Sequence, residues 1–594
     1  MYQYTDFDKQ FVKLRAQQFR DQLERWERGE MTDDQLLPLR LQNGWYIQRY
    51  APMARIAVPY GEVSSLQLRT LAHIAREYDR PEPELLAQAQ ATQDALEASQ
   101  PGATLLAPQL RYGYGHFTTR TNCQFNWIPL SKAADVMDLL ASVSMHGIQT
   151  SGNDIRNITC DAWEGIAEDG IVDCRPFAEI TRQWSSLHPE FSYLPRKFKI
   201  AFNGAKEDRA AIGWYDIGLQ ALKNEAGEVG FTVLVGGGMG RTPIIGSVVR
   251  EFLPWAELLN YIEAIIRVYN GYGRRDNKWK ARIKILVKSE GQAFIDAVEK
   301  EYAAIVELDG APHRITQAEF DRVASHFVIP ELKAANLESK VDPKGQLYQR
   351  WIAQNVRGHQ LPGMKTVTLS FKRAGFAPGD ADAATMEALA ELAEKFSAAE
   401  ARLTHEQNLL LPWVFESDLP ALYEAARKLG LATPNIGLLT DMIACPGGDF
   451  CSLANARSLH IAHAVTERYQ DLDELFDIGP IDLHMSGCIN SCGHHHSGHI
   501  GILGVDKDGK EWYQITLGGA DGTALSGPSI GGKVVGPAFT AAEVPDVIEA
   551  LLDSYRAQRL PEEHFIDTLR RAGHEAFKAA ANAARHPRLE ESHA

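Results

Sequence analysis

The sequence lacks any uninterrupted run of about 18 apolar residues, so it predicts no membrane-spanning helix. The segment from Met1 to Arg20 is charged and has no apolar core of a signal peptide. Basic residues are outnumbered, 61 against 77 acidic ones, and the net charge of −16 argues against extensive nucleic-acid binding. Cysteines are few and odd in number, seven in all, which fits reduced thiols better than a disulfide framework. These absences predict a cytoplasmic protein with no membrane or nucleic-acid partner.

A nucleotide-binding fingerprint is also missing. Gly236, Gly237 and Gly238 follow a β-rich stretch, but Pro243 and Gly246 interrupt the segment before a helix could open. No acidic residue follows a second strand about 20 residues further on, where a dinucleotide site would need one. A glycine nest that cradles a carboxylate or a phosphate is the more plausible interpretation.

The remaining composition is typical of a globular protein, with 45% apolar and 23% charged residues. Its 594 residues predict about three to five domains. In the helix expected over Ser65–Glu77, Leu66, Leu68, Leu71 and Ile74 would face inward. The other expected helices are Phe7–Arg28, Thr32–Gln42, Pro81–Pro101, Ala133–Val143, Ala383–Phe396, Leu419–Leu429, Ala541–Tyr555 and Glu562–Ala583, and the expected strands are Ala51–Val58, His116–Ile128, Lys365–Phe371 and Ala401–Val414.

Two parts of the chain repeat one another. The segment from Thr118 to Asn122 (TTRTN) aligns with the segment from Thr404 to Asn408 (THEQN), and both lie in the same order of strands and helices. Strand–helix–strand order also arises by chance. We interpret the repeat as an internal duplication, in which a small βαβ module and a larger α/β module occur twice. A polar linker at 337–354 would join the halves.

Four of the seven cysteines form two close pairs. Five residues separate Cys445 from Cys451, three separate Cys488 from Cys492, and 36 lie between the pairs. Adjacent glycines let the backbone turn around a bulky group, so four converging thiolates predict a metal or iron–sulfur site. Zinc is the main alternative, although zinc sites favour two to four residues within a pair. Four unrelated buried thiols are the other alternative.

Arg120, Arg156, Lys197 and Lys199 are candidates for an anion site. At strand spacing Lys197 and Lys199 share one face, where like charges repel unless an anion or solvent lies between them. A solvated edge strand would explain the two lysines equally well. A second basic run at 274–282 suits a polyanionic cofactor, but it could also be a solvated face.

A histidine-rich segment directly follows Cys492. Histidines in such a run can ligate a metal, but the four cysteines complete a ligand set without them. These histidines are His494, His495, His496 and His499. The three remaining cysteines, at 123, 160 and 174, are interpreted as ordinary buried thiols.

From about residue 51 to residue 573 the sequence resembles the sirohaem-dependent sulfite and nitrite reductases. The features that carry this resemblance are the cysteine pairs, the duplication, the segment LPRKFK, the GGG loop and the second basic run. The resemblance implies an α+β, pseudo-twofold fold with two ferredoxin-like modules and two larger α/β domains. The implied division is an N-terminal helical segment (1–50), a first ferredoxin-like half-domain (51–150), a first sirohaem- and substrate-binding domain (151–340), a second ferredoxin-like half-domain (355–435) and a domain for the [4Fe–4S] cluster and sirohaem (436–594).

The resemblance also implies residue roles. Cys445, Cys451, Cys488 and Cys492 would ligate a [4Fe–4S] cluster, and Cys492 would also bridge to the sirohaem iron. The catalytic, anion-binding residues would be Arg120, Arg156, Lys197 and Lys199. Further residues that would bind the cofactors are Gly236, Gly237, Gly238, Arg241, Arg275, Asn277, Lys280, Arg282 and Asn490.

The reaction that the resemblance implies is the six-electron reduction of sulfite to sulfide in assimilatory sulfur metabolism, with nitrite reduction to ammonia as the alternative. Nitrite reductases of this family commonly carry asparagine at the position of Lys199, so this lysine favours sulfite. Glu406 stands where the first repeat has Arg120, which implies one surviving active site. Thr121 and the histidines after Gly493 depart from the family pattern. Because no flavin or nicotinamide fingerprint occurs, electrons would come from another protein, either ferredoxin or an NADPH-dependent diflavin reductase.

Overall fold

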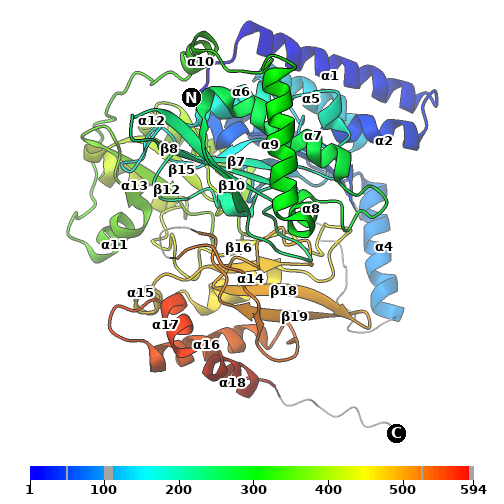
Figure 1. Ribbon diagram of the computed structural model, residues 1–594. Coiled ribbons are helices and arrows are strands. Elements are labelled where there is room, and N and C mark those ends of the chain that lie inside the picture. The colour runs from blue at the N-terminus through cyan, green and yellow to red at the C-terminus, as the bar shows by residue number, and fades with distance from the viewer. Residues whose placement is uncertain (49–50, 100–110, 523–525, 587–594) are drawn as a thin grey trace.

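The structure is a computed structural model that describes residues 1–48, 51–99, 111–522 and 526–586. Within these ranges the strands form four five-stranded sheets, and helices cover them (Figure 1). None of the helices in the described ranges is both long enough and apolar enough to cross a membrane.

Two small antiparallel sheets form the ferredoxin-like modules. The first has the order β1-β2-β5-β4-β13 and the second has the order β11-β12-β15-β14-β3. The strands of the first sheet are β1 (Trp45–Ile47), β2 (Pro52–Ile56), β4 (Tyr114–Phe117), β5 (Cys123–Phe125) and β13 (Asp380–Asp382). Those of the second are β3 (Glu62–Ser64), β11 (Val356–Arg357), β12 (Met364–Leu369), β14 (Glu400–Leu403) and β15 (Leu409–Phe415). Each module therefore takes its last strand from the other half of the chain.

Two larger mixed sheets share one pairing pattern. In each sheet the first three strands run parallel to one another, and each of the last two strands is antiparallel to the strand before it. One consists of β6 (Thr159–Cys160), β7 (Ile200–Asn203), β8 (Ile217–Lys223), β9 (Val229–Val235) and β10 (Ser247–Pro254). The other consists of β16 (Ile443–Ala444), β17 (Leu483–Ser486), β18 (Ile500–Lys507), β19 (Lys510–Leu517) and β20 (Lys533–Val534). The repetition of both sheet types confirms the predicted internal duplication.

Helices α3 (Ser65–Glu77) and α12 (Ala383–Phe396) pack against each other between the halves. Ser64 and Asp382 accept hydrogen bonds from the first turns and so begin these helices. The other helices are α1 (Asp6–Glu27), α2 (Asp33–Gln42), α4 (Pro83–Ser99), α5 (Ala133–Ser142), α6 (Arg175–Ser185), α7 (Leu258–Tyr272), α8 (Ile283–Glu290), α9 (Gln292–Glu307), α10 (Gln317–Ala324), α11 (Gln346–Asn355), α13 (Leu419–Lys428), α14 (Leu459–Arg468), α15 (Leu472–Ile478), α16 (Val544–Gln558), α17 (Phe565–Ala572) and α18 (Glu575–Ala583).

The two repeated segments are turns, not strand interiors. Thr118 N donates to Asn122 O at 2.9 Å, and Thr404 N donates to Asn408 O at 3.0 Å. The fourth residue of each segment is left-handed, with φ 54° at Thr121 and φ 61° at position 407. The continuous strands predicted over 116–128 and 401–414 are therefore wrong, because this backbone conformation ends one strand and starts the next.

Three smaller expectations also fail. Leu66 is 60% exposed, because it lies in the first turn of α3 on the side away from the core that holds Leu68 and Leu71. The second part of the expected linker is helical and forms α11. The last predicted helix is divided into α17 and α18 at Gly573, whose φ is 81°.

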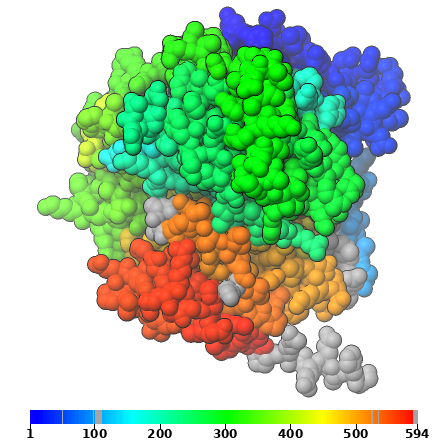
Figure 2. Space-filling model, in the orientation of Figure 1, coloured from blue at the N-terminus to red at the C-terminus, as the bar shows by residue number. Residues whose placement is uncertain are grey.

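The C-terminal segment, orange and red in Figure 2, forms the lower part of the visible face, and the green segment packs above it. Trp214 Nε1 donates to Asp521 O at 3.0 Å, and His496 Nε2 lies 2.9 Å from Gly240 O. These bonds join the two larger sheet regions directly.

Where each exchanged strand joins its sheet, a buried carboxylate lies beside a basic side chain. On one side Glu62 lies 3.9 Å from Arg402 and accepts a bond from Arg175 Nη1 at 2.6 Å. On the other side Asp380 lies 2.6 Å from His116 Nδ1. Arg402 is 1% exposed and also contacts Glu400 at 3.0 Å, so its charge offsets two buried carboxylates.

Replacing Arg402 with methionine should lower the free energy of unfolding by about 3 kcal/mol, because Glu62 and Glu400 would lose the buried cation that they share. Each carboxylate keeps one other cation, Arg175 for Glu62 and the amino group of Met1 for Glu400. Arg69→Met is the matched control, since Arg69 joins the same two halves through an exposed ion pair with Glu394 and should cost at most about 1 kcal/mol. Urea unfolding measures both values. Equal losses in the two variants would contradict the importance given to the buried pair.

Candidate functional site

The two cysteine pairs lie on loops that leave neighbouring strands. Cys445 and Cys451 follow β16, and Cys488 and Cys492 follow β17. β16 and β17 are parallel neighbours, so their carboxyl ends meet at one edge of the sheet. The sheet thus brings together cysteines that are distant in sequence.

Two glycines allow these loops to touch. A Cβ atom on Gly493 would lie 1.8 Å from Met485 O, and one on Gly487 would lie 2.4 Å from Ala456 O. No other residue fits such close backbone approaches without movement. Gly487 N also donates to Cys445 Sγ at 3.3 Å, which aims that sulfur at the space between the loops.

Burial disfavours ionisation of these thiols in the protein alone. It raises the pKa of Cys445 and Cys451, and it raises the pKa of Cys488 to about 11, with the neighbouring thiols adding to each shift. A cation that binds the sulfurs would offset this cost. The donor set therefore fits an iron-containing group.

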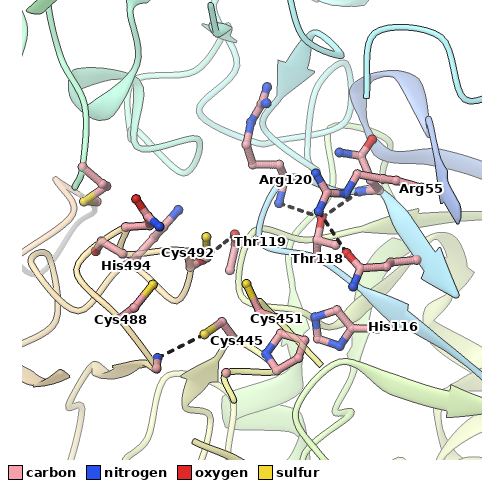
Figure 3. Close-up of a pocket in the computed structure, with 18 of the residues that line it drawn as sticks. Arg55, His116, Thr118, Thr119, Arg120, Cys445, Cys451, Cys488, Cys492 and His494 are labelled. Carbon is pink, nitrogen blue, oxygen red and sulfur yellow. Dashed lines mark hydrogen bonds between the residues drawn. The ribbon is translucent and has the colours of Figure 1, made fainter. Parts of the chain in front are cut away.

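All four cysteines line one pocket (Figure 3). About 1210 Å³ of empty space, open solvent included, lies in this pocket and at its mouth. Cys492 is the exposed member of the set and faces this space. Among the residues described, no three His, Cys, Asp or Glu side chains are placed to hold a single metal ion.

The predicted basic residues form another wall of the same pocket: Arg120, Arg156, Lys197 and Lys199. Arg120 projects from the turn between β4 and β5 rather than from a strand. Its Nη2 donates to Asn157 O at 2.7 Å, while its Nε is buried without a hydrogen-bond partner in the described structure. Arg156 donates to Thr150 O at 2.8 Å and to Gly152 O at 2.6 Å. These backbone bonds hold both guanidinium groups in place.

Lys197 and Lys199 lie on one side of their segment, as predicted, but the segment precedes strand β7 and is not a solvated edge. Phe198 between them is fully buried and forms a β-bridge with Ile155. Burial lowers the pKa of Lys197 to about 7. Burial lowers the pKa of Lys199 well below its usual value, and the charges of Arg120 and Lys197 lower it further.

Asp216 organises the basic wall and was not identified from the sequence. This fully buried carboxylate accepts a bond from Lys199 N at 2.9 Å and binds the guanidinium of Arg282 at 2.8 Å. The sequence feature that could have identified Asp216 is the position of an acidic residue directly before the apolar strand β8. Arg282 and Asn490, both predicted to bind cofactor, line the pocket as well.

Seven predicted cofactor-binding residues do not line the pocket. Arg275 is exposed and donates to Tyr193 O at 2.8 Å, and Asn277 O accepts a bond from Lys280 N. A Cβ atom on Gly237 would lie 2.3 Å from Gly213 O, so close backbone packing explains the glycine there. The other members of this group are Gly236, Gly238, Arg241 and Lys280, of which Arg241 and Lys280 are exposed.

Of the four histidines after Cys492, His494 lines the pocket. Burial and the charge of Lys199 lower its pKa well below the usual range. His496 contacts Gly240 O, and His499 Nδ1 accepts a bond from Asp482 N at 3.1 Å. His495 is 1% exposed, with neither ring nitrogen bonded in the described structure.

Arg55, His116 and Gln407 also line the pocket and were missed by sequence reasoning. Arg55 donates to Gln124 Oε1 at 3.0 Å, and Figure 3 shows it beside the basic wall. A charged residue in the middle of the apolar strand β2 was the available signal. The pocket can thus hold a large thiolate-bound group against one wall and an anion against the other.

Comparison with known families agrees with this geometry. Residues 151–305 and 439–587, roughly half of the chain, match the nitrite and sulphite reductase 4Fe-4S domain. Residues 364–429 match the nitrite/sulfite reductase ferredoxin-like half domain.

Individual relatives are distant but span most of the chain. Sulfite reductase [ferredoxin] 1 of Mycolicibacterium paratuberculosis is 26% identical and covers 77% of both chains. The assimilatory ferredoxin-dependent nitrite reductase of Haloferax mediterranei is 27% identical over 86% of this chain and 80% of its own. The chloroplastic ferredoxin–nitrite reductase of Arabidopsis thaliana is 26% identical over 85% of this chain and 76% of its own.

A solved structure shows the same fold. The Mycobacterium tuberculosis NirA protein superposes with a TM-score of 0.70 over 92% of both chains, at 22% identity. The α+β fold with repeated ferredoxin-like sheets is thereby confirmed. The chain belongs to the nitrite and sulfite reductase family, whose oxidoreductases work with a [4Fe–4S] cluster and sirohaem.

Proposed function

We propose that this protein reduces sulfite to sulfide by six electrons in assimilatory sulfur metabolism. The observation that carries the proposal is the pocket in which four cysteines and four basic side chains meet. Sulfite carries up to two negative charges and nitrite carries one. Four converging basic side chains, which a bound anion would keep protonated, suit the more highly charged anion.

Cys445, Cys451, Cys488 and Cys492 would hold the cluster, and the exposed thiol of Cys492 would also meet the sirohaem iron. These groups supply electrons to the bound anion. Arg282 and Asn490 line the pocket and would contact the sirohaem. We assign no pocket contact to Gly236, Gly237, Gly238, Arg241, Arg275, Asn277 or Lys280.

The basic wall would bind and protonate the anion. Arg120 and Arg156 are fixed by backbone carbonyls, so they can orient the anion's oxygens without reorganising. Lys197, with a pKa of about 7, can give up and regain a proton near neutrality. Each oxygen that leaves as water needs such protons.

Nitrite reduction to ammonia is the second candidate, because relatives named for both anions match this chain to a similar extent. The presence of Lys199 favours sulfite. For electrons we propose a separate protein, ferredoxin or an NADPH-dependent diflavin reductase, and the ferredoxin in the names of the relatives supports the former.

Steady-state rates with sulfite and with nitrite, using a reduced viologen as donor, test the substrate. We expect kcat/KM to be higher for sulfite because the pocket gathers four basic side chains, which a doubly charged anion would keep protonated. A higher kcat/KM for nitrite would assign the enzyme to the second candidate.

Cys492→Ser should remove the visible absorption bands of sirohaem coupled to the cluster, because a hydroxyl is a poor iron ligand. Spectra and iron content of the purified protein measure this effect. Cys174→Ala is the control, since Cys174 is buried outside the pocket and its variant should keep the bands. Retention of normal spectra and activity by Cys492→Ser would refute its assignment.

Lys199→Asn should lower kcat/KM for sulfite by at least about tenfold and affect nitrite less, because it removes a cation from the basic wall. Lys206→Asn removes an exposed lysine of the same half and should leave both values unchanged. Competition assays with the two anions would show the shift. An equal loss for both anions would mean that Lys199 does not select between them.

A further inference from the structure

His405 lies in the turn between β14 and β15 and occupies the position that Thr119 has in the first repeat. It is 7% exposed. The two repeated turns meet through this side chain, because His405 Nδ1 lies 3.1 Å from Thr119 O. The turn of the second repeat therefore contacts the turn that carries Arg120.

Both ring nitrogens of His405 face carbonyl oxygens. His405 Nε2 lies 3.2 Å from Cys160 O, on the other side of the ring from Thr119. A carbonyl oxygen only accepts hydrogen bonds, and a neutral imidazole has one N–H. Whichever nitrogen carries the hydrogen, the ring fills the space between Thr119 O and Cys160 O and so holds Thr119 next to strand β6.

Thr119 touches both walls of the pocket. Thr119 Oγ1 donates to Cys492 O at 3.1 Å, and Arg120 is the next residue along the turn. The His405 ring also lies edge-on to Tyr215, at 6.5 Å between centroids. The Tyr215 ring in turn faces the Arg120 guanidinium at 5.6 Å.

We propose that His405 is a positioning residue for anion binding. It holds the turn 118–122 so that Thr119 reaches the Cys492 loop and Arg120 faces the pocket. The turn needs such support, because its left-handed Thr121 is a strained conformation for a β-branched residue. The proposal rests on the anion-binding role proposed above for Arg120.

Two substitutions of His405 separate its hydrogen bonds. The side-chain nitrogen of asparagine reaches about as far as Nδ1, and that of glutamine about as far as Nε2. His405→Asn should keep the bond to Thr119 O and stay within about twofold of wild type in the Kd for sulfite. His405→Gln should keep only the bond to Cys160 O and raise that Kd and the KM by about three- to tenfold.

The experiment uses the cofactor-loaded protein. Sulfite and nitrite are titrated separately against its visible spectrum, and KM and kcat are measured for the same samples. His146→Gln is the control, because His146 is equally buried and lies outside the pocket. It should lower the melting temperature and leave the Kd unchanged.

Equal Kd values in His405→Asn and His405→Gln, whether normal or raised together, would overturn the proposal. If His405→Gln fails to load cofactors, Thr119→Val removes the next link, the bond from Thr119 Oγ1 to Cys492 O, and should raise the Kd. An unchanged Kd would overturn the proposal too. A wild-type protein that binds and reduces neither anion would instead refute the proposed function.

Discussion

The site depends on one constraint, which is that groups of the same kind are buried beside one another, basic side chains on one wall of the pocket and thiols on the other. On one wall, burial lowers the pKa of Lys197 and Lys199, and on the other it raises the pKa of Cys445 and Cys488. Ionising the groups of either wall therefore costs free energy when no ligand is bound. The buried carboxylate of Asp216 and several backbone carbonyls hold the basic side chains in place. The free-energy cost of burying these side chains is therefore offset when the protein folds. An anion and an iron-containing group then bind to groups that are already oriented.

The internal duplication divides the work between the halves. The first half supplies the basic wall, and the second supplies the cysteines, on loops that leave parallel strands at one edge of a sheet. The second copy of the turn keeps the backbone of the first but carries Glu406 in place of Arg120. Its neighbour His405 contacts Thr119 O, and Gln407 lines the pocket. The second copy has thus become support for the first.

Much of this arrangement could be predicted from the sequence, and the failures have physical causes. Helix α3 followed from apolar periodicity, and the cysteine set followed from its spacing. The turn at Thr121 was missed because its left-handed residue is not glycine and carries no local signal. Arg275 and Lys280 are exposed and do not line the pocket, because a basic run does not reveal which way it faces, and their contact with the cofactor stays a prediction. The exchange of β3 and β13 left no trace in the sequence, since such pairing depends on the whole chain. The five-part division stays a prediction.

That exchange also determines when the protein can fold. Glu62 pairs with Arg402, and Tyr114 pairs with Asp382, so neither small sheet is complete within its own half. During synthesis the first module must wait, with one strand edge open, until the chain has grown beyond residue 382. Contacts over such long separations close slowly and leave edges exposed to wrong partners. Although the halves are repeats, they cannot be produced apart as complete modules. Two ancestral copies have become one folding unit.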